Sequence, residues 1–184
     1  LQLAVMAARL ASGQNVDPIL TKSINGRNIH NSKNIQDLDI EKSHLKIVRK
    51  ALFQASNDRR GTAYGSRIIS DAYRMAGKTG TSQVRNITDK EREIGVTKNE
   101  DLPWKRRDHG LFINFAPYNN PEIAVSVVVE HGGAGSRSAA PIARDITLQA
   151  LFKGKPPLEV YPAKDRPAVL KQQNKLGEVL KELE

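Results

Sequence analysis

The chain has 184 residues, of which 29 are Lys or Arg and 20 are Asp or Glu, so its formal net charge is +9 at pH 7. This length suits one domain of ordinary size, or a domain with a tail. The sequence has no Cys, which excludes disulfides, zinc ribbons and thiolate-held iron–sulfur sites. Its apolar runs are far shorter than the roughly 20 residues that cross a bilayer as a helix.

The positive charge favours either a surface for nucleic acid or anionic membranes, or a solvated basic face. Basic residues are spread along the whole chain, and their densest cluster is Lys105-Arg106-Arg107. We therefore favour the solvated face and expect no nucleic-acid partner. The 4 His residues lack the spacing of a metal site, and we expect neither a metal nor a cofactor.

The first half of the chain predicts two helices. Residues 1–11 are apolar at helical spacing and are followed by Gly13, a typical residue at a helix C-terminus. Residues 40–55 form a second amphipathic pattern. Between the two helices, the polar residues 26–34 predict a turn or a small hairpin.

The second half predicts three strands, in the order 78–84, 109–118 and 122–131. The last two are joined by Asn119-Asn120-Pro121 as a hairpin, and the third is apolar at nearly every position, so both its faces should be buried. The charged stretch 85–108 predicts a long loop without regular structure. We expect its Trp104 to pin it to the body of the protein.

A last amphipathic pattern predicts a helix over residues 139–152, with Ser136 or Ser138 as its N-cap. Prolines then mark a linker, and residues 169–183 have only a weak amphipathic pattern. We expect a frayed tail there rather than a helix for a partner. The chain thus divides into two parts, residues 1–152 and residues 153–184.

The window from Met75 to Gln83 carries the most chemical information and allows two interpretations. Gly77-Lys78-Thr79 matches the end of a phosphate-binding P-loop. The full motif also needs a Gly at the position of Ala72, and it needs a helix after the Lys, where this sequence is polar and aperiodic. We therefore reject the P-loop interpretation.

The second interpretation is the Lys-Thr-Gly motif of penicillin-recognising serine enzymes, placed on a strand. Thr79 and Thr81 alternate onto one face of such a strand, so their two hydroxyls can hold one carboxylate. Gly80 lets a substrate lie close to the backbone. Lys78 adds positive potential for the carboxylate and for proton transfer, and the Thr81 N–H can donate to a developing oxyanion.

Several further segments resemble the transpeptidase domain of penicillin-binding proteins, most of all class B enzymes of the elongation type. The resemblance covers residues 1–152. The segments that carry it, besides the window itself, are Leu1 to Ala8, Gly61-Thr62-Ala63, Asp108 to Ile113, Phe115-Ala116-Pro117, Glu130 to Gly133 and Ala139 to Ala143.

The resemblance implies an α+β penicillin-binding and β-lactamase-like fold, with helices flanking a mostly antiparallel five-stranded sheet. This chain should supply three of the five strands, which leaves the strand at 123–129 as an exposed, apolar edge. Such an edge favours self-association. The chain opens without Met inside a predicted helix, and we expect it to be a fragment that begins after the Ser-x-x-Lys and Ser-x-Asn motifs of the family.

Three segments match the missing motifs literally, but they occur in the wrong order along the chain to be the family motifs; we call them decoys. We interpret Ser43 as a polar residue in the first turns of a helix. The three matches are Ser43-His44-Leu45-Lys46, Ser23-Ile24-Asn25 and Ser32-Lys33-Asn34.

The family's activity implies the function of the intact protein, a peptidoglycan D,D-transpeptidase. A Ser attacks the D-Ala-D-Ala bond of a stem peptide, an acyl-enzyme forms, and an amine of a second strand resolves it; β-lactams trap the acyl-enzyme. The resemblance implies catalytic roles for Lys78 and Thr81 and substrate binding by Lys78, Thr79, Gly80 and Thr81. Without its nucleophile the fragment should be inactive.

The resemblance also implies a bacterial inner-membrane protein whose catalytic domain faces the periplasm. Its expected partners are a lipid-linked glycan polymerase and shape-determining scaffold proteins. The alternative that remains open is a non-catalytic basic binding module on the same fold. An upstream Ser-x-x-Lys and Ser-x-Asn in the family order would distinguish the two.

Overall fold

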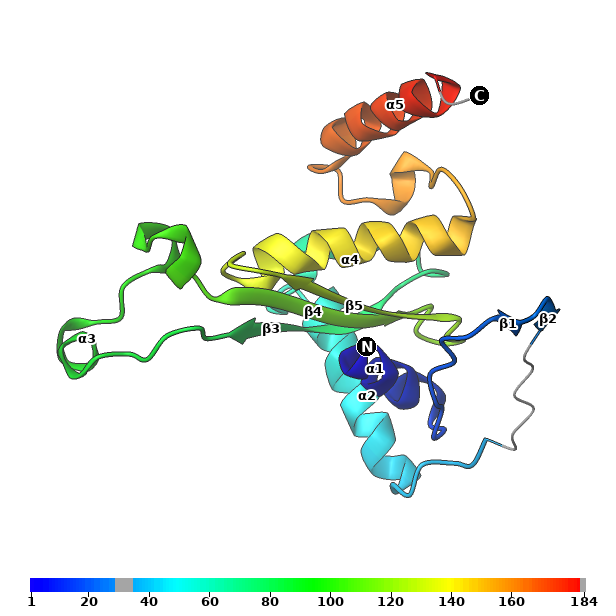
Figure 1. Cartoon of the computed structure of the whole chain (residues 1–184), viewed down its shortest axis with the longest axis horizontal. Helices are drawn as coiled ribbons and strands as arrows, with labels where there is room; N and C mark the ends of the chain where they lie inside the picture. Colours follow the sequence, from blue (N-terminus) through cyan, green and yellow to red (C-terminus); the bar gives the residue numbers. More distant parts are fainter. Residues whose placement is uncertain (29–34, 183–184) are drawn as a thin grey trace.

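A computed structural model describes residues 1–28 and 35–182. Its centre is an antiparallel sheet of three strands in the order β3-β4-β5, which are β3 (Ala76–Ser82), β4 (His109–Ala116) and β5 (Ile123–Val129). Helices cover both faces of the sheet (Figure 1). The three predicted strands and their order are confirmed.

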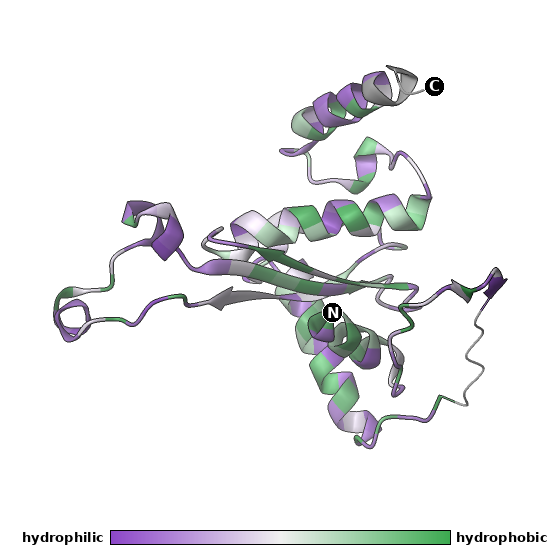
Figure 2. Cartoon of the chain, viewed as in Figure 1, coloured by the Kyte–Doolittle hydropathy of each residue, from purple (hydrophilic) through white to green (hydrophobic). Residues whose placement is uncertain are grey.

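Two helices, α1 (Gln2–Ser12) and α2 (Lys42–Asn57), pack on one face of the sheet, and α4 (Gly135–Phe152) covers the other. The alternation of β4 explains both layers, because successive side chains of a strand point to opposite faces. Phe112 lies in the core with α4 and Phe115 in the core with α1 and α2, and both are almost completely buried. Figure 2 shows the hydrophobic residues concentrated on these layers.

The small hairpin predicted after the first helix is present as β1 (Ser23–Ile24) and β2 (Arg27–Asn28). Its turn places Asn25 and Gly26 at positive φ, where Gly and Asn are the residues that fit best. The rest of the predicted turn, residues 29–34, lies outside the described residues, and so does the decoy match Ser32-Lys33-Asn34.

The predicted burial of both faces of β5 is wrong, because only the face toward α4 is buried and Ala124 and Ser126 on the other face are half-buried. Val125 and Val127 are buried under α4, but Val128 on the opposite face is 52% exposed. Val128 is exposed because α1 and α2 cover that face of the sheet only in part (Figure 1).

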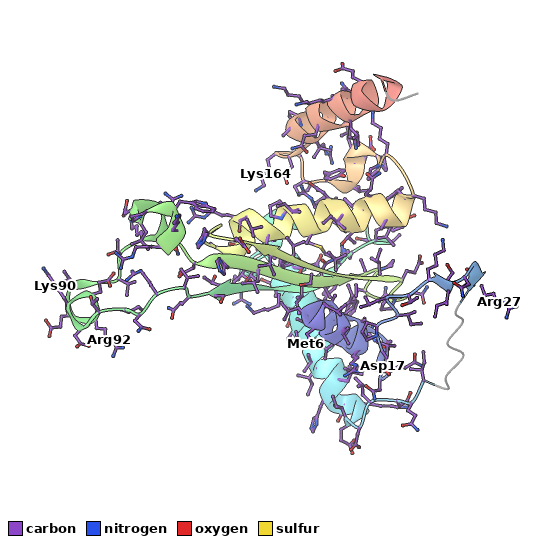
Figure 3. All side chains as sticks on the ribbon, in the orientation of Figure 1. Met6, Asp17, Arg27, Lys90, Arg92 and Lys164 are labelled. Atoms are coloured by element: carbon purple, nitrogen blue, oxygen red, sulfur yellow. The ribbon has the colours of Figure 1, made fainter. Side chains whose placement is uncertain are left out.

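The long loop predicted over 85–108 is not without structure. Residues 83–108, here called the arm, project away from the sheet and carry α3 (Asp89–Ile94), η2 (Asn99–Asp101) and η3 (Trp104–Arg106) (Figure 1). Thr88 and Glu91 form a reciprocal capping box at the start of α3, which satisfies backbone N–H groups that would otherwise lack partners. Lys90 and Arg92 lie at the tip of the arm (Figure 3).

The C-terminal segment is also more ordered than predicted. Instead of a frayed tail, Arg166–Glu182 forms the helix α5, preceded by η4 (Leu158–Val160). Val160, Tyr161 and Val169 belong to the core that α4 shares with the sheet, so the first turn of α5 is held by packing.

The division of the chain at residue 152 stays a prediction. Among the described residues, every helix is too short or too polar to span a lipid bilayer.

Candidate functional site

The Lys-Thr-Gly triplet lies on β3, which has β4 as its only partner strand among the described residues. The register pairs Lys78 with Ile113 and Thr79 with Phe112, so Thr79 shares the α4 face with the buried Phe112. Lys78 lies on the opposite face. The structure therefore brings the four predicted residues together as consecutive positions at one edge of the sheet.

Because β3 is an edge strand, the long side chain of Lys78 can bend around it. The Lys78 Nζ lies 2.9 Å from the Thr79 carbonyl oxygen and 3.5 Å from Thr79 Oγ1. The side chain of Lys78 is exposed. The ammonium group is thus held beside the Thr79 hydroxyl and open to solvent, where it can attract an anion.

A residue to which the sequence assigned no role also contacts this edge. Thr62, in the loop between α2 and the short helix η1 (Tyr64–Ser66), places its Oγ1 2.9 Å from Thr79 Oγ1. The hydrogen bond fixes the orientation of the Thr79 hydroxyl. The two residues are 17 positions apart, and no local pattern in the sequence signals a contact at this separation.

The backbone of β3 is held from the other side by the end of α2. Ser56 Oγ donates to the Gly77 carbonyl oxygen at 3.4 Å, and Asn57 Nδ2 donates to the Met75 carbonyl oxygen at 2.9 Å. A Cβ at Gly77 would lie 2.6 Å from Phe112 Cζ, so only glycine fits. The start of the triplet is therefore rigidly positioned.

The other end of the triplet lies under the first residues of α4. Thr81 is exposed and pairs with Gly110, and a Cβ at Gly135 would lie 2.5 Å from the Gly80 carbonyl oxygen. Helix α4 begins at Gly135 rather than at the predicted Ala139, with Ala134 at the N-cap and no side-chain cap. Since Gly135 has no side chain, the helix can start directly against β3.

Two histidines connect the sheet to the arm beyond this end. The His131 N–H donates to His109 Nδ1 at 2.9 Å, and His131 Nδ1 lies 2.9 Å from the Arg107 carbonyl oxygen. The Trp104 ring packs edge-on against His131 with 4.5 Å between ring centroids. Trp104 therefore contacts the body as predicted, although it is 57% exposed. His109 and His131 join the arm to β4 and β5.

The decoy Ser43 lies far from this site. It is the second residue of α2 and is exposed, while the contact of α2 with β3 is made at Ser56. A helix rises about 1.5 Å per residue, which puts Ser43 about 20 Å from Ser56 along α2. The interpretation of Ser43 as a polar residue at the start of a helix is confirmed.

Residues 1–148 match the family described as the penicillin binding protein transpeptidase domain. The peptidoglycan D,D-transpeptidase MrdA of Haemophilus influenzae is 34% identical over 117 residues, which are 63% of this chain and 17% of the relative. MrdA of Acinetobacter baumannii is 33% identical over 146 residues, 77% of this chain and 21% of the relative. The chain thus matches about a fifth or less of these relatives' length.

Solved structures with the same fold include penicillin-binding protein 2 (PBP2) of Pseudomonas aeruginosa in complex with WCK 5153. It has 32% sequence identity and a TM-score of 0.60, and the match covers 89% of this chain and 31% of that chain. PBP2 of Helicobacter pylori in complex with MreC has 25% identity and a TM-score of 0.59, with 81% of this chain and 24% of that chain covered. The predicted α+β fold is confirmed.

Proposed function

Because the chain belongs to the penicillin-binding protein transpeptidase family, with a class B, PBP2-like sequence, we propose that it is part of a serine-type peptidoglycan D,D-transpeptidase. One observation carries the proposal. Lys78, Thr79, Gly80 and Thr81 are presented together on an edge strand, with the Lys78 ammonium held beside the Thr79 hydroxyl. An extended peptide can lie along such an edge.

In this proposal β3 holds the end of a stem peptide that terminates in D-Ala-D-Ala. Lys78 attracts the terminal carboxylate and takes part in proton transfer, and the hydroxyls of Thr79 and Thr81 bind the carboxylate. Gly80 leaves room for the peptide backbone, and the Thr81 N–H donates to the oxyanion that forms when a Ser attacks the scissile carbonyl. A β-lactam would occupy the same edge.

The 184-residue polypeptide alone should not be acylated. Its one Ser-x-x-Lys match begins at Ser43, about 20 Å along α2 from the contact with β3. We expect no adduct with labelled penicillin in intact-mass spectrometry. A stoichiometric adduct that disappears in Ser43→Ala would contradict this expectation and make Ser43 the nucleophile.

Binding to the edge can be tested without turnover. We expect a peptide ending in D-Ala-D-Ala to shift the amide resonances of residues 78–81 in nuclear magnetic resonance (NMR) titrations, and Lys78→Ala to weaken this binding about tenfold through the loss of a charge-assisted contact. Lys90→Ala, at the tip of the arm (Figure 3), is the control. Equal affinities for Lys78→Ala and the unchanged chain would count against the proposal.

The same proposal extends to the setting of the intact protein. We propose that it acts at the bacterial inner membrane with its catalytic domain in the periplasm, beside a lipid-linked glycan polymerase and shape-determining scaffold proteins. The complex of Helicobacter pylori PBP2 with MreC supports an assembly with a protein partner.

A further inference from the structure

A pocket of about 500 Å³ opens between the root of the arm and the loop that leads into α4. This volume is in the range of small-molecule sites. Nothing in the predicted roles of β3 uses it. Its lining residues are Lys98, Asn99, Glu100, Arg107, His131, Gly132, Gly133, Ala134 and Arg137.

The charged groups of the pocket are mostly cationic. The lining contains three cationic side chains, those of Lys98, Arg107 and Arg137, and one carboxylate, that of Glu100. Arg137 Nη1 lies 3.7 Å from Glu100 Oε2, and both side chains are well exposed, at 81% and 61%. An exposed pair at this distance contributes little, so an incoming anion can replace Glu100 as the partner of Arg137.

The walls of the pocket are held by hydrogen bonds that do not depend on a ligand. The Asp108 N–H donates to Asn99 Oδ1 at 2.8 Å, and Asn99 Nδ2 donates to Asp108 Oδ2 at 3.0 Å. The Gly133 N–H donates to the Asp108 carbonyl oxygen at 2.8 Å. Arg107 Nε donates to the Leu102 carbonyl oxygen at 3.0 Å. The pocket is therefore preformed, which lowers the entropic cost of binding.

The pocket lies next to the end of the Lys-Thr-Gly strand. Gly110, the partner of Thr81, is covered by the loop, because a Cβ there would lie 3.1 Å from the Gly133 carbonyl oxygen. Gly135 likewise lies directly against β3, because a Cβ there would be 2.5 Å from the Gly80 carbonyl oxygen. Arg137, in the first turn of α4, also lines a second cavity whose wall includes Thr62, the partner of Thr79.

We propose that this pocket binds a second carboxylate of the peptide whose C-terminal carboxylate lies on β3, and that Arg137 is the residue that selects for it. The assignment of the peptide to β3 rests on the proposed function. The anion site itself rests on the pocket and its cations. The ligand class is an acidic peptide that carries a side-chain carboxylate upstream of its C-terminus.

Two variants should act in opposite directions. Arg137→Ala removes a cation and should weaken anion binding about tenfold, the size expected for one charge-assisted hydrogen bond. Glu100→Gln removes the competing carboxylate and should strengthen the binding. Arg106→Ala is the matched control, because Arg106 is an exposed arginine of the arm that does not line the pocket.

The anion site can be tested with glutarate, independently of the transpeptidase proposal. In an NMR titration of the whole chain at low salt, we expect glutarate to shift the amide resonances of residues 132–134 and 137. The affinity should follow the order Glu100→Gln, unchanged chain, Arg137→Ala, and should fall with added salt. No shift of these resonances, or an equal loss in Arg106→Ala, would overturn the site.

The link to β3 needs a second pair of probes, acetyl-Glu-Lys-D-Ala-D-Ala and acetyl-Gln-Lys-D-Ala-D-Ala. We expect the unchanged chain to prefer the Glu peptide and Arg137→Ala to lose the preference while it still binds both peptides at residues 78–81. Equal binding of both peptides by the unchanged chain would overturn the proposed selectivity alone. Absence of any peptide effect at residues 78–81, with glutarate still bound, would instead contradict the proposed function of β3.

Discussion

At the scale of single residues, the candidate site depends on close contacts that glycine permits. Gly135 lets α4 begin against the backbone of Gly80, and this contact positions the end of the Lys-Thr-Gly strand. The sequence shows a run of glycines before a helix, but only the structure distinguishes the glycine that is enclosed by backbone from those that are not.

Gly135→Ala should destabilise the chain by about 2 kcal/mol or more, because the added methyl group would overlap the backbone of β3 and β4. Gly177→Ala is the matched control inside α5, where the structure places no described atom within 4 Å of the added carbon. It should be neutral or stabilise by up to about 1 kcal/mol. Chemical denaturation followed by circular dichroism measures both, and similar effects of the two would refute the argument.

At the scale of elements, the outer part of the arm is held by the ion pair of Arg85 and Glu91. Arg85 Nη1 and Nη2 each donate to a carboxylate oxygen of Glu91 at 2.7 Å. Glu91 also accepts the N–H groups of Thr88 and Thr97. Glu91 thereby connects Arg85, on the segment before α3, to Thr97, on the segment after it. The same bonds keep the pKa of Glu91 well below its ordinary value, chiefly through the hydrogen bond with Arg85.

The order of the arm should therefore depend on pH. Because the folded arm lowers the pKa of Glu91, the stabilisation is present above the ordinary Glu value of 4.5 and is lost as the pH falls below it. We expect the hydrogen-exchange protection factors of α3, which are corrected for the intrinsic pH dependence of amide exchange, to fall at low pH, and in Glu91→Gln already at neutral pH. Glu93→Gln, on the same helix, is the control. Unchanged exchange in Glu91→Gln would show that other contacts order the arm.

The C-terminal segment depends on a second ion pair. Arg144 of α4 is 3% exposed and donates to Asp145 at 2.8 Å and to Asp165, just before α5. Asp165→Asn should weaken the docking of residues 158–169 by about 1–3 kcal/mol, because it removes a charged partner from a buried guanidinium. Limited proteolysis should then cut near Asp165 sooner. Asp71→Asn, which removes the exposed pair with Arg74, is the control. The protease should cut this variant no faster than the unchanged chain.

At the scale of the whole molecule, β5 is an edge strand of the described sheet, and Val128 is 52% exposed. An apolar β-branched edge pairs readily with another chain. We expect the 184-residue chain to self-associate with rising concentration in light scattering, and Val128→Lys to suppress the association. A monomer at high concentration would contradict the expectation.

Much of this molecule could be predicted from the sequence because the signals are local. The periodicity of residues 40–55 and the alternation at 109–116 depend only on neighbouring positions, and both the helix and the strand are present. The Lys-Thr-Gly triplet was found for the same reason. Two expectations were wrong, the structureless loop at 85–108 and the frayed tail. Short-range polar contacts such as the Thr88–Glu91 capping box order the loop, and hydrophobic periodicity does not reveal them. The start of the tail is ordered by contacts with α4, which is distant in sequence.

The sequence by itself determined the family, the three strands and the position of the candidate site, since these follow from the order of residues along the chain. Only the tertiary structure decided which groups surround the site. The hydrogen bond between Thr62 and Thr79, the start of α4 against Gly80 and the cationic pocket around Arg137 all join segments far apart in sequence. No local pattern encodes such contacts, because they arise when separate elements pack on the same sheet.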